Sequence, residues 1–277
     1  MIIFGFVITI LLGLIIGSFL NVVIYRLPIM MKREWHLQSC DILGHTSTWN
    51  HAEISLITPN SHCPQCQTPI KPWHNIPVIS YLLLGGRCKQ CSAKISCRYL
   101  IIELLTGLAS GITFWRFGYT WQMGLLLVLS WGLIAASAID IAEHFIPDTI
   151  TLSLLWLGLL ANVFFVFTSP GNAILGALIG YLLFWCIAKL FYLIRKKEGL
   201  GHGDFKLLAL FGGWIGMWPI LNIVIFSSIL GIIVSLGFIF SKKINFSSQI
   251  PFGPFLALGG WCTIVFGDFI TNAILRF

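Results

Sequence analysis

Eight apolar runs take up most of the sequence, and they restrict the possible fold more than any other feature. They cover roughly residues 2–24, 100–116, 121–141, 150–168, 172–194, 205–217, 219–240 and 252–274. Most reach the length of roughly 20 residues that a helix needs to cross a bilayer. Only 10% of the residues are charged, against about 25% in soluble domains. We therefore expect an all-α polytopic membrane protein with about eight transmembrane helices in the lipid bilayer, or seven if the short run at 205–217 is re-entrant.

The positive charges give the expected orientation, because cytoplasmic loops are enriched in Lys and Arg. If the polar segment 25–98 is cytoplasmic, 14 of the 17 cations lie inside or at that edge, and the opposite orientation inverts the bias. We therefore expect an extracytoplasmic N-terminus, with residues 2–24 as a retained span rather than a signal peptide. The net charge of +7 then reflects membrane topology and does not indicate a nucleic-acid partner.

Composition divides the chain into three predicted parts. Residues 1–24 are the first transmembrane helix, 25–98 a polar cytoplasmic loop, and 99–277 a transmembrane core. The loop contains two Cys-x-x-Cys pairs with 21 residues between them, formed by Cys63, Cys66, Cys88 and Cys91. Two such pairs supply four thiolates for a tetrahedral zinc ion.

Four thiolate ligands leave no open coordination position, so the predicted zinc is structural. A reducing cytoplasm disfavours disulfides, although a redox pair or unligated thiols remain the alternatives. We expect Cys40, Cys186 and Cys262 to be packing residues, and Cys97 lies near the site but is not needed as a ligand.

Two of the ten acidic residues stand at the ends of apolar runs. Asp140 closes the run 121–141, and Asp204, in the Gly201–Lys206 segment, directly precedes the run 205–217. Ionisable residues at membrane depth are functional candidates. Two carboxylates at one site can share a proton, so that one acts as base toward water while the other polarises a carbonyl. The alternative is that each aspartate caps a helix or pairs with Lys206 or a loop arginine.

Two further acids have weaker claims to a catalytic role. Asp148 follows Pro147 and is typical of a helix start, where an acidic side chain is favourable. Glu103 lies at the start of a span, where it could contact a nearby Lys or Arg, and we assign it no catalytic role. The histidines lack the spacing of a zinc peptidase, and we expect His202 to be a spacer within its turn.

The chain resembles the type IV prepilin peptidases, also called prepilin leader peptidase/N-methyltransferases. The resemblance rests on segments in order along nearly the whole chain, namely Gly17–Pro28, the four paired cysteines, Pro72–Pro77, Asp140 with Pro147-Asp148, Gly201–Lys206 and Pro251–Pro254. It implies a GxGD-type aspartic peptidase of the bacterial inner membrane, with Asp140 and Asp204 as the catalytic pair facing the cytoplasm.

The resemblance also implies the substrates, which are prepilins and pseudopilins of type IV pilus biogenesis and type II secretion. Members with the long cysteine loop methylate the new N-terminal residue with S-adenosylmethionine, so 25–98 is the expected methyltransferase region. No Gly-rich nucleotide motif is visible, and a peptidase without methyl transfer stays open. A polytopic transporter and a scaffold that docks a secretion partner are the alternatives from other classes.

Overall fold

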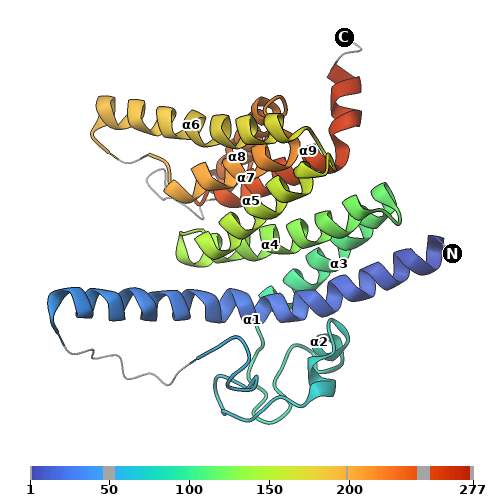
Figure 1. Ribbon diagram of the computed structural model, residues 1–277. Helices are drawn as coiled ribbons and strands as arrows, with labels where there is room; N and C mark the ends of the chain where they lie inside the picture. Colours follow the sequence, from blue (N-terminus) through green and yellow to red (C-terminus); the bar gives the residue numbers. More distant parts are fainter. Residues whose placement is uncertain (1, 46–53, 198, 242–249, 275–277) are drawn as a thin grey trace. The chain divides into compact units, whose positions relative to one another are not determined.

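The computed structural model describes residues 2–45, 54–197, 199–241 and 250–274. It divides the chain into two compact units, Met1–Gly118 and Tyr119–Phe277. Regular structure in these described ranges is helical, apart from two isolated β-bridges (Figure 1). The all-α prediction is therefore confirmed.

Five helices of the described chain are long and apolar enough to cross a membrane. They are α1 (Ile2–Leu43), α3 (Cys97–Phe117), α4 (Trp121–Glu143), α6 (Pro170–Arg195) and α8 (Ile220–Phe240). The other apolar runs form α5 (Asp148–Val163), α7 (His202–Ile215) and α9 (Gly253–Ile274). Each apolar run thus forms one helix. With 14 residues, α7 is about 21 Å long, shorter than the hydrocarbon core of about 30 Å.

The first unit is held together by close packing of α1 against α3. A Cβ on Gly13 would lie 2.5 Å from the Ser110 hydroxyl oxygen, and one on Gly17 would lie 2.7 Å from the Cα of Glu103. Reciprocally, a Cβ on Gly107 would lie 2.7 Å from a methyl carbon of Leu14. Small residues at a spacing of four let membrane helices approach until their backbones nearly touch.

The polar part of the first unit begins as a continuation of α1, which runs to Leu43. Residue 24 therefore marks the end of the apolar run and not the end of the helix. Arg26 is buried, and its guanidinium donates to the backbone carbonyls of Ser55, Leu56 and Pro59. The remaining short helices are η1 (Pro72–Asn75) and α2 (Ile79–Leu83).

In the second unit, α7 is the inner helix, and α5, α6 and α9 pack against it. All of its residues from Leu207 to Trp214 are buried. The backbones of Gly176 on α6 and Gly212 on α7 touch, and a Cβ on Gly180 would lie 2.7 Å from the Leu208 carbonyl oxygen. Glycine at these crossings lets the neighbouring helices approach α7 closely and enclose it.

Asn162 at the end of α5 fixes the C-terminal end of α7. Its side-chain nitrogen donates to the carbonyls of Gly213 and Trp214 at 2.9 and 2.8 Å. Its side-chain oxygen accepts from the amides of Phe167 and Thr168, each at 3.0 Å. A fully buried amide with every hydrogen bond made specifies one arrangement of the elements that it joins.

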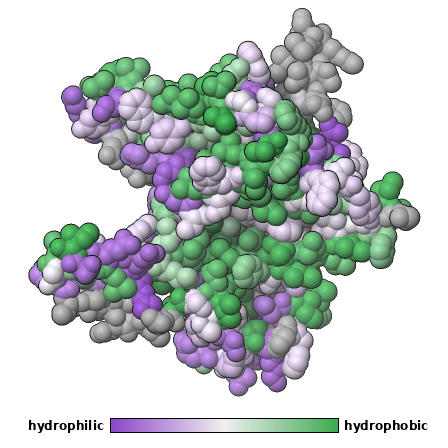
Figure 2. All heavy atoms as spheres, in the orientation of Figure 1, coloured by the Kyte–Doolittle hydropathy of each residue, from purple (hydrophilic) through white to green (hydrophobic). Residues whose placement is uncertain are grey.

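The surface agrees with insertion in a membrane. Figure 2 shows apolar side chains over much of the visible helical surface, while polar ones gather on the C-terminal half of α1 and around α2. Large apolar residues on the helices are exposed, among them Ile15, Trp156, Ile174 and Ile233. In water such a surface is costly, whereas lipid covers it without penalty.

Candidate active site and cysteine cluster

Asp140 lies in the last turn of α4 and is buried, with 6% of its surface exposed. The helix ends at His144, which adopts a left-handed conformation (φ 57°) and donates its amide to the Asp140 carbonyl at 3.0 Å. The backbone amide of Gly253, the first residue of α9, hydrogen-bonds to the Asp140 carboxylate. The carboxylate is thus held from the start of a helix more than 100 residues later in the chain.

Asp204 is the third residue of α7 and is also buried, with 7% exposed. Its carboxylate reaches back to the backbone amide of Gly201, the N-cap residue. This contact satisfies a donor that the helix itself leaves free. An acidic group in a first turn is also favoured by the helix dipole.

The two aspartates lie on elements that meet around Ile146. Ile146 fills the space beside them. A Cβ on Gly203 would lie 3.0 Å from the Ile146 Cβ, and one on Gly253 would lie 2.8 Å from its Cδ1. Two glycines therefore bring α7 and α9 close to the loop after α4, the region in which both Asp140 and Asp204 stand.

The other polar residues near this pair have separate partners. Asp148 begins α5, as its sequence context predicts, and both of its carboxylate oxygens accept from Lys206 Nζ, at 2.7 and 2.6 Å. The alternative that Lys206 pairs with Asp140 or Asp204 is not found among the described contacts. The His202 ring packs against Phe205 in a tilted arrangement, with 5.3 Å between ring centroids, which fits its expected role as a spacer.

The four paired cysteines come together in the first unit. All four sulfur atoms lie within 4.8 Å of one another and could hold a metal ion. The Cys63 and Cys91 sulfurs are 3.8 Å apart, and those of Cys66 and Cys88 are 4.0 Å apart. A tetrahedral zinc ion with Zn–S bonds of about 2.3 Å requires a sulfur–sulfur separation of about 3.8 Å. The residues therefore fit such an ion.

The two cysteine pairs are held by copies of one turn, 25 residues apart in the sequence. In the first turn Cys63 donates its amide to Thr68, and Gln67 donates to Cys63. In the second, Cys88 donates to Ala93, and Ser92 donates to Cys88. The hydroxyl and amide of Thr68 lower the pKa of Cys66 to about 6, which favours the thiolate that a metal requires.

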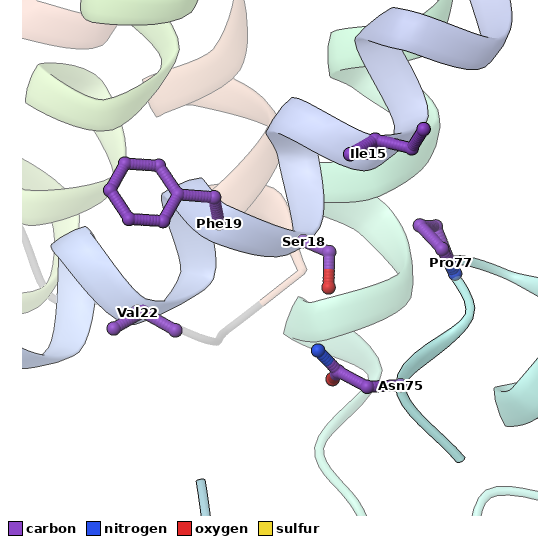
Figure 3. A pocket seen from close by; sticks show the side chains of 6 residues that line it. All are labelled: Ile15, Ser18, Phe19, Val22, Asn75 and Pro77. Atoms are coloured by element: carbon purple, nitrogen blue, oxygen red, sulfur yellow. The ribbon is translucent and has the colours of Figure 1, made fainter. Parts of the chain in front are cut away.

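Glu103 has an environment that the sequence did not predict. It is buried in α3, and its carboxylate accepts from the Val78 amide at 2.8 Å and from the Ser18 hydroxyl. The expected Lys or Arg partner is not among its described contacts. Ser18 also lines a pocket, with Ile15, Phe19 and Val22 from α1, Asn75 from the end of η1, and Pro77 just after it (Figure 3).

Comparison with known proteins places the chain in a family. Residues 11–117 match the model of the bacterial peptidase A24 N-terminal domain, and residues 127–236 match the type IV leader peptidase family. These two matches fall within the first and second structural units respectively. No solved structure matches the chain.

Several relatives match along nearly the whole chain, and each is named prepilin leader peptidase/N-methyltransferase. That of Pseudomonas aeruginosa is 48% identical over 97% of this chain and 93% of its own length. The relative from Stutzerimonas stutzeri is 46% identical over 96% and 92%, and that from Aeromonas hydrophila 43% identical over 95% and 91%. The chain therefore belongs to the type IV leader peptidase family.

Proposed function

We propose that the protein cleaves the leader from prepilins and pseudopilins and then methylates the new N-terminus. The observation that carries the peptidase part is the pair of buried, interacting carboxylates, one from the end of α4 and one from the start of α7. Membership of the type IV leader peptidase family gives the substrate class, because the relatives are named for prepilin leaders.

Asp140 and Asp204 act as an aspartate dyad of the GxGD type in this proposal. Two neighbouring carboxylates share one proton, since ionising both is unfavourable. The ionised group takes a proton from the attacking water, and the protonated group donates to the oxygen of the scissile carbonyl. Their backbone partners, the amides of Gly253 and Gly201, orient both side chains before substrate arrives.

The membrane arrangement follows from the cleavage site of such substrates. A basic leader stays in the cytoplasm and an apolar helix stays in lipid, so the scissile bond lies at the cytoplasmic interface. Both aspartates are at helix ends, where water is available. We propose eight spans in the inner membrane with the N-terminus outside, an orientation that also puts the cysteine cluster in the cytoplasm.

Zinc is the metal that the cysteine cluster would hold. Four thiolates at these separations match its tetrahedral preference and leave no position for a substrate. The ion would join two turns of a polar segment that has little apolar core of its own. Its role is therefore to order the segment between α1 and α3.

Methyl transfer is the second activity in this proposal, with S-adenosylmethionine as the donor. Support comes from the names of the relatives and from the complete cysteine cluster in the N-terminal domain. Because the acceptor amine exists only after cleavage, methyl transfer must follow it.

A direct test combines substitution with mass spectrometry of the substrate. Asp140→Asn and Asp204→Asn remove a carboxylate with little change in shape, and each should abolish release of the leader in reconstituted membranes. Asp41→Asn, at an exposed position on α1, is the matched control and should cleave normally. Cleavage at the wild-type rate in either dyad variant would exclude this mechanism. The mass of the trimmed N-terminus reports in the same experiment whether a methyl group has been added.

A further inference from the structure

The segment between the two cysteine pairs carries an exposed apolar face that neither proposed activity uses. On α2, Ile79, Leu82 and Leu83 are spaced by three and four residues, which places them on one side of the helix. All three are exposed, Leu83 most of all at 81%. Trp73 on η1 and Ile76 just after it are exposed as well. An exposed apolar face of this kind marks contact with a membrane or with a partner.

The segment packs beside the membrane-spanning part of α1. Asn75 and Pro77 line a pocket with four α1 residues between Ile15 and Val22 (Figure 3), and Figure 1 shows α2 beside the N-terminal half of α1. Arg26 is the first charged residue of the chain. At 1.5 Å per residue, the pocket lies about 6–17 Å from Arg26 on the apolar side. One half of the hydrocarbon core is about 15 Å thick, so the segment is at the depth of lipid.

A hydrogen bond to α3 holds the segment at this depth. The Val78 amide donates to the buried Glu103 carboxylate at 2.8 Å. Val78 has φ 61°, a conformation that β-branched residues avoid, so the contact fixes the backbone where it would otherwise relax. Glu103 is also the residue at which Gly17 of α1 crosses α3, well inside the apolar run 2–24.

The backbone of the segment meets the requirement for a place in lipid, where no water is available to its polar groups. The buried Ser80 hydroxyl accepts from the Ile76 amide at 3.1 Å and donates to the Trp73 carbonyl at 3.0 Å. After α2, the amides of residues 85–87 turn back to carbonyls in or next to the helix. A segment that is hydrogen-bonded in this way can lie among acyl chains, whereas an open loop cannot.

The flanks of the segment are basic. Between Ile54 and Arg98 the sequence contains five Lys and Arg residues and no Asp or Glu. Lys71, just before η1, and Arg87, shortly after α2, are both exposed, and the Lys71 ammonium lies over the Trp73 ring, 5.6 Å from its centroid. Trp and basic side chains are typical of the membrane interface. Their charge complements anionic lipid headgroups, which favours lipid as the partner of this face.

We propose that η1 and α2 form a re-entrant anchor in the cytoplasmic leaflet. Ile79, Leu82 and Leu83 contact acyl chains, while Lys71 and Arg87 contact anionic headgroups. The chain enters lipid after the first cysteine pair and returns to the surface before the second. The anchor therefore fixes the height of the cysteine cluster above the membrane. This inference does not depend on cleavage or on methyl transfer, so it can fail while both activities stand.

A photoreactive side chain identifies what covers the apolar face. A benzophenone amino acid is placed at Leu83, and the protein is reconstituted in nanodiscs with equal amounts of phosphatidylcholine and phosphatidylglycerol. Irradiation should attach lipid at this position. Mass spectrometry should find phosphatidylglycerol in the adducts at about twice its share of the bilayer or more, because cations nearby attract anionic headgroups.

The matched control for this experiment is Leu43, an exposed leucine at the end of α1. It lies about 25 Å beyond Arg26 along the helix, outside the acyl chains, and should give at least about tenfold less lipid adduct than Leu83. Protein adducts at Leu83 in place of lipid would mean that a second copy or another part of the chain covers the face. The absence of any adduct would mean that water covers it, and either result overturns the proposal.

Substitutions test the two parts of the anchor separately. Leu83→Glu puts a carboxylate among acyl chains and should speed proteolysis between α1 and α3 about tenfold, whereas Leu43→Glu should not change it. Because Leu83 is exposed, this effect cannot come from the protein interior, and wild-type proteolysis in Leu83→Glu refutes the lipid contact. Combining Lys71→Gln with Arg87→Gln should return phosphatidylglycerol to its bulk share in the adducts, and an unchanged enrichment refutes the headgroup contact.

Discussion

Gly253→Ala should slow cleavage strongly although it adds one methyl group. The new Cβ would lie 2.6 Å from Oδ2 of Asp140 and 2.8 Å from Cδ1 of Ile146. Reaching an ordinary contact of 3.4 Å requires movements of 0.8 and 0.6 Å, respectively. Because the methyl is confined on both sides, the carboxylate or the start of α9 must shift.

The size of the effect follows from that displacement. A misplacement of about 1 Å in a catalytic group costs up to about a hundredfold in rate, so we expect a tenfold to hundredfold lower single-turnover rate. That corresponds to about 1.4–2.7 kcal/mol in activation free energy. Overpacking should also destabilise the fold by about 1–3 kcal/mol, which thermal unfolding in detergent would detect. Gly253 is not among the described glycines with a positive φ, so a loss of activity in the variant cannot be attributed to backbone strain.

Two variants make this experiment decisive. Gly124→Ala lies in α4, the helix that carries Asp140, but has open space around its Cβ; it should leave cleavage unchanged. Ile146→Val in the Gly253→Ala background removes Cδ1, lets the added methyl move away from Asp140 and should restore part of the rate. A folded Gly253→Ala enzyme with wild-type activity would refute the argument, because α9 would then not constrain the carboxylate.

Three other outcomes are expected. Cys66→Ser should lower the zinc content, measured by metal analysis, from about one ion per chain. It should also increase proteolytic cleavage between α1 and α3. Full zinc content in the variant would show that Cys66 is not a zinc ligand. Asp148→Asn should lower the unfolding free energy by at most about 1 kcal/mol, because the Lys206 and Asp148 side chains are 29% and 50% exposed. If the loss of stability is the same in high salt, it does not come from the ion pair. Asn162→Leu should lower the unfolding free energy by about 3 kcal/mol, since four buried backbone groups lose their partner, and an unchanged melting temperature would show that water replaces the amide.

The helices were predictable because each apolar run carries its own signal. The end of α1 was not, since Pro28 interrupts the helical pattern and polar residues become frequent from Lys32 onward. The cysteine cluster was predictable from spacing alone, because two tight turns fix the four sulfurs once they meet. A feature was predictable from the sequence where neighbouring residues determine it.

The surroundings of the acids depend on contacts between distant segments. The positions of Asp140 and Asp204 at the ends of apolar runs suggested that they pair. The contact between the Gly253 amide and the Asp140 carboxylate was not predictable, because it joins α4 to α9 across more than 100 residues. Glu103 could be placed in a span, yet its burial follows from the glycine crossing of α1 and α3. A sequence identifies such acids as unusual, while their partners come only from the packing.

The proposed cleavage and methyl transfer must occur in a fixed order. The amine that accepts the methyl group does not exist until the peptide bond has been cut. Trimmed but unmethylated chains must then exist as an intermediate, and disruption of the cysteine cluster in the first unit should cause them to accumulate. This order needs no signal from one activity to the other, because cleavage itself creates the group that methyl transfer requires.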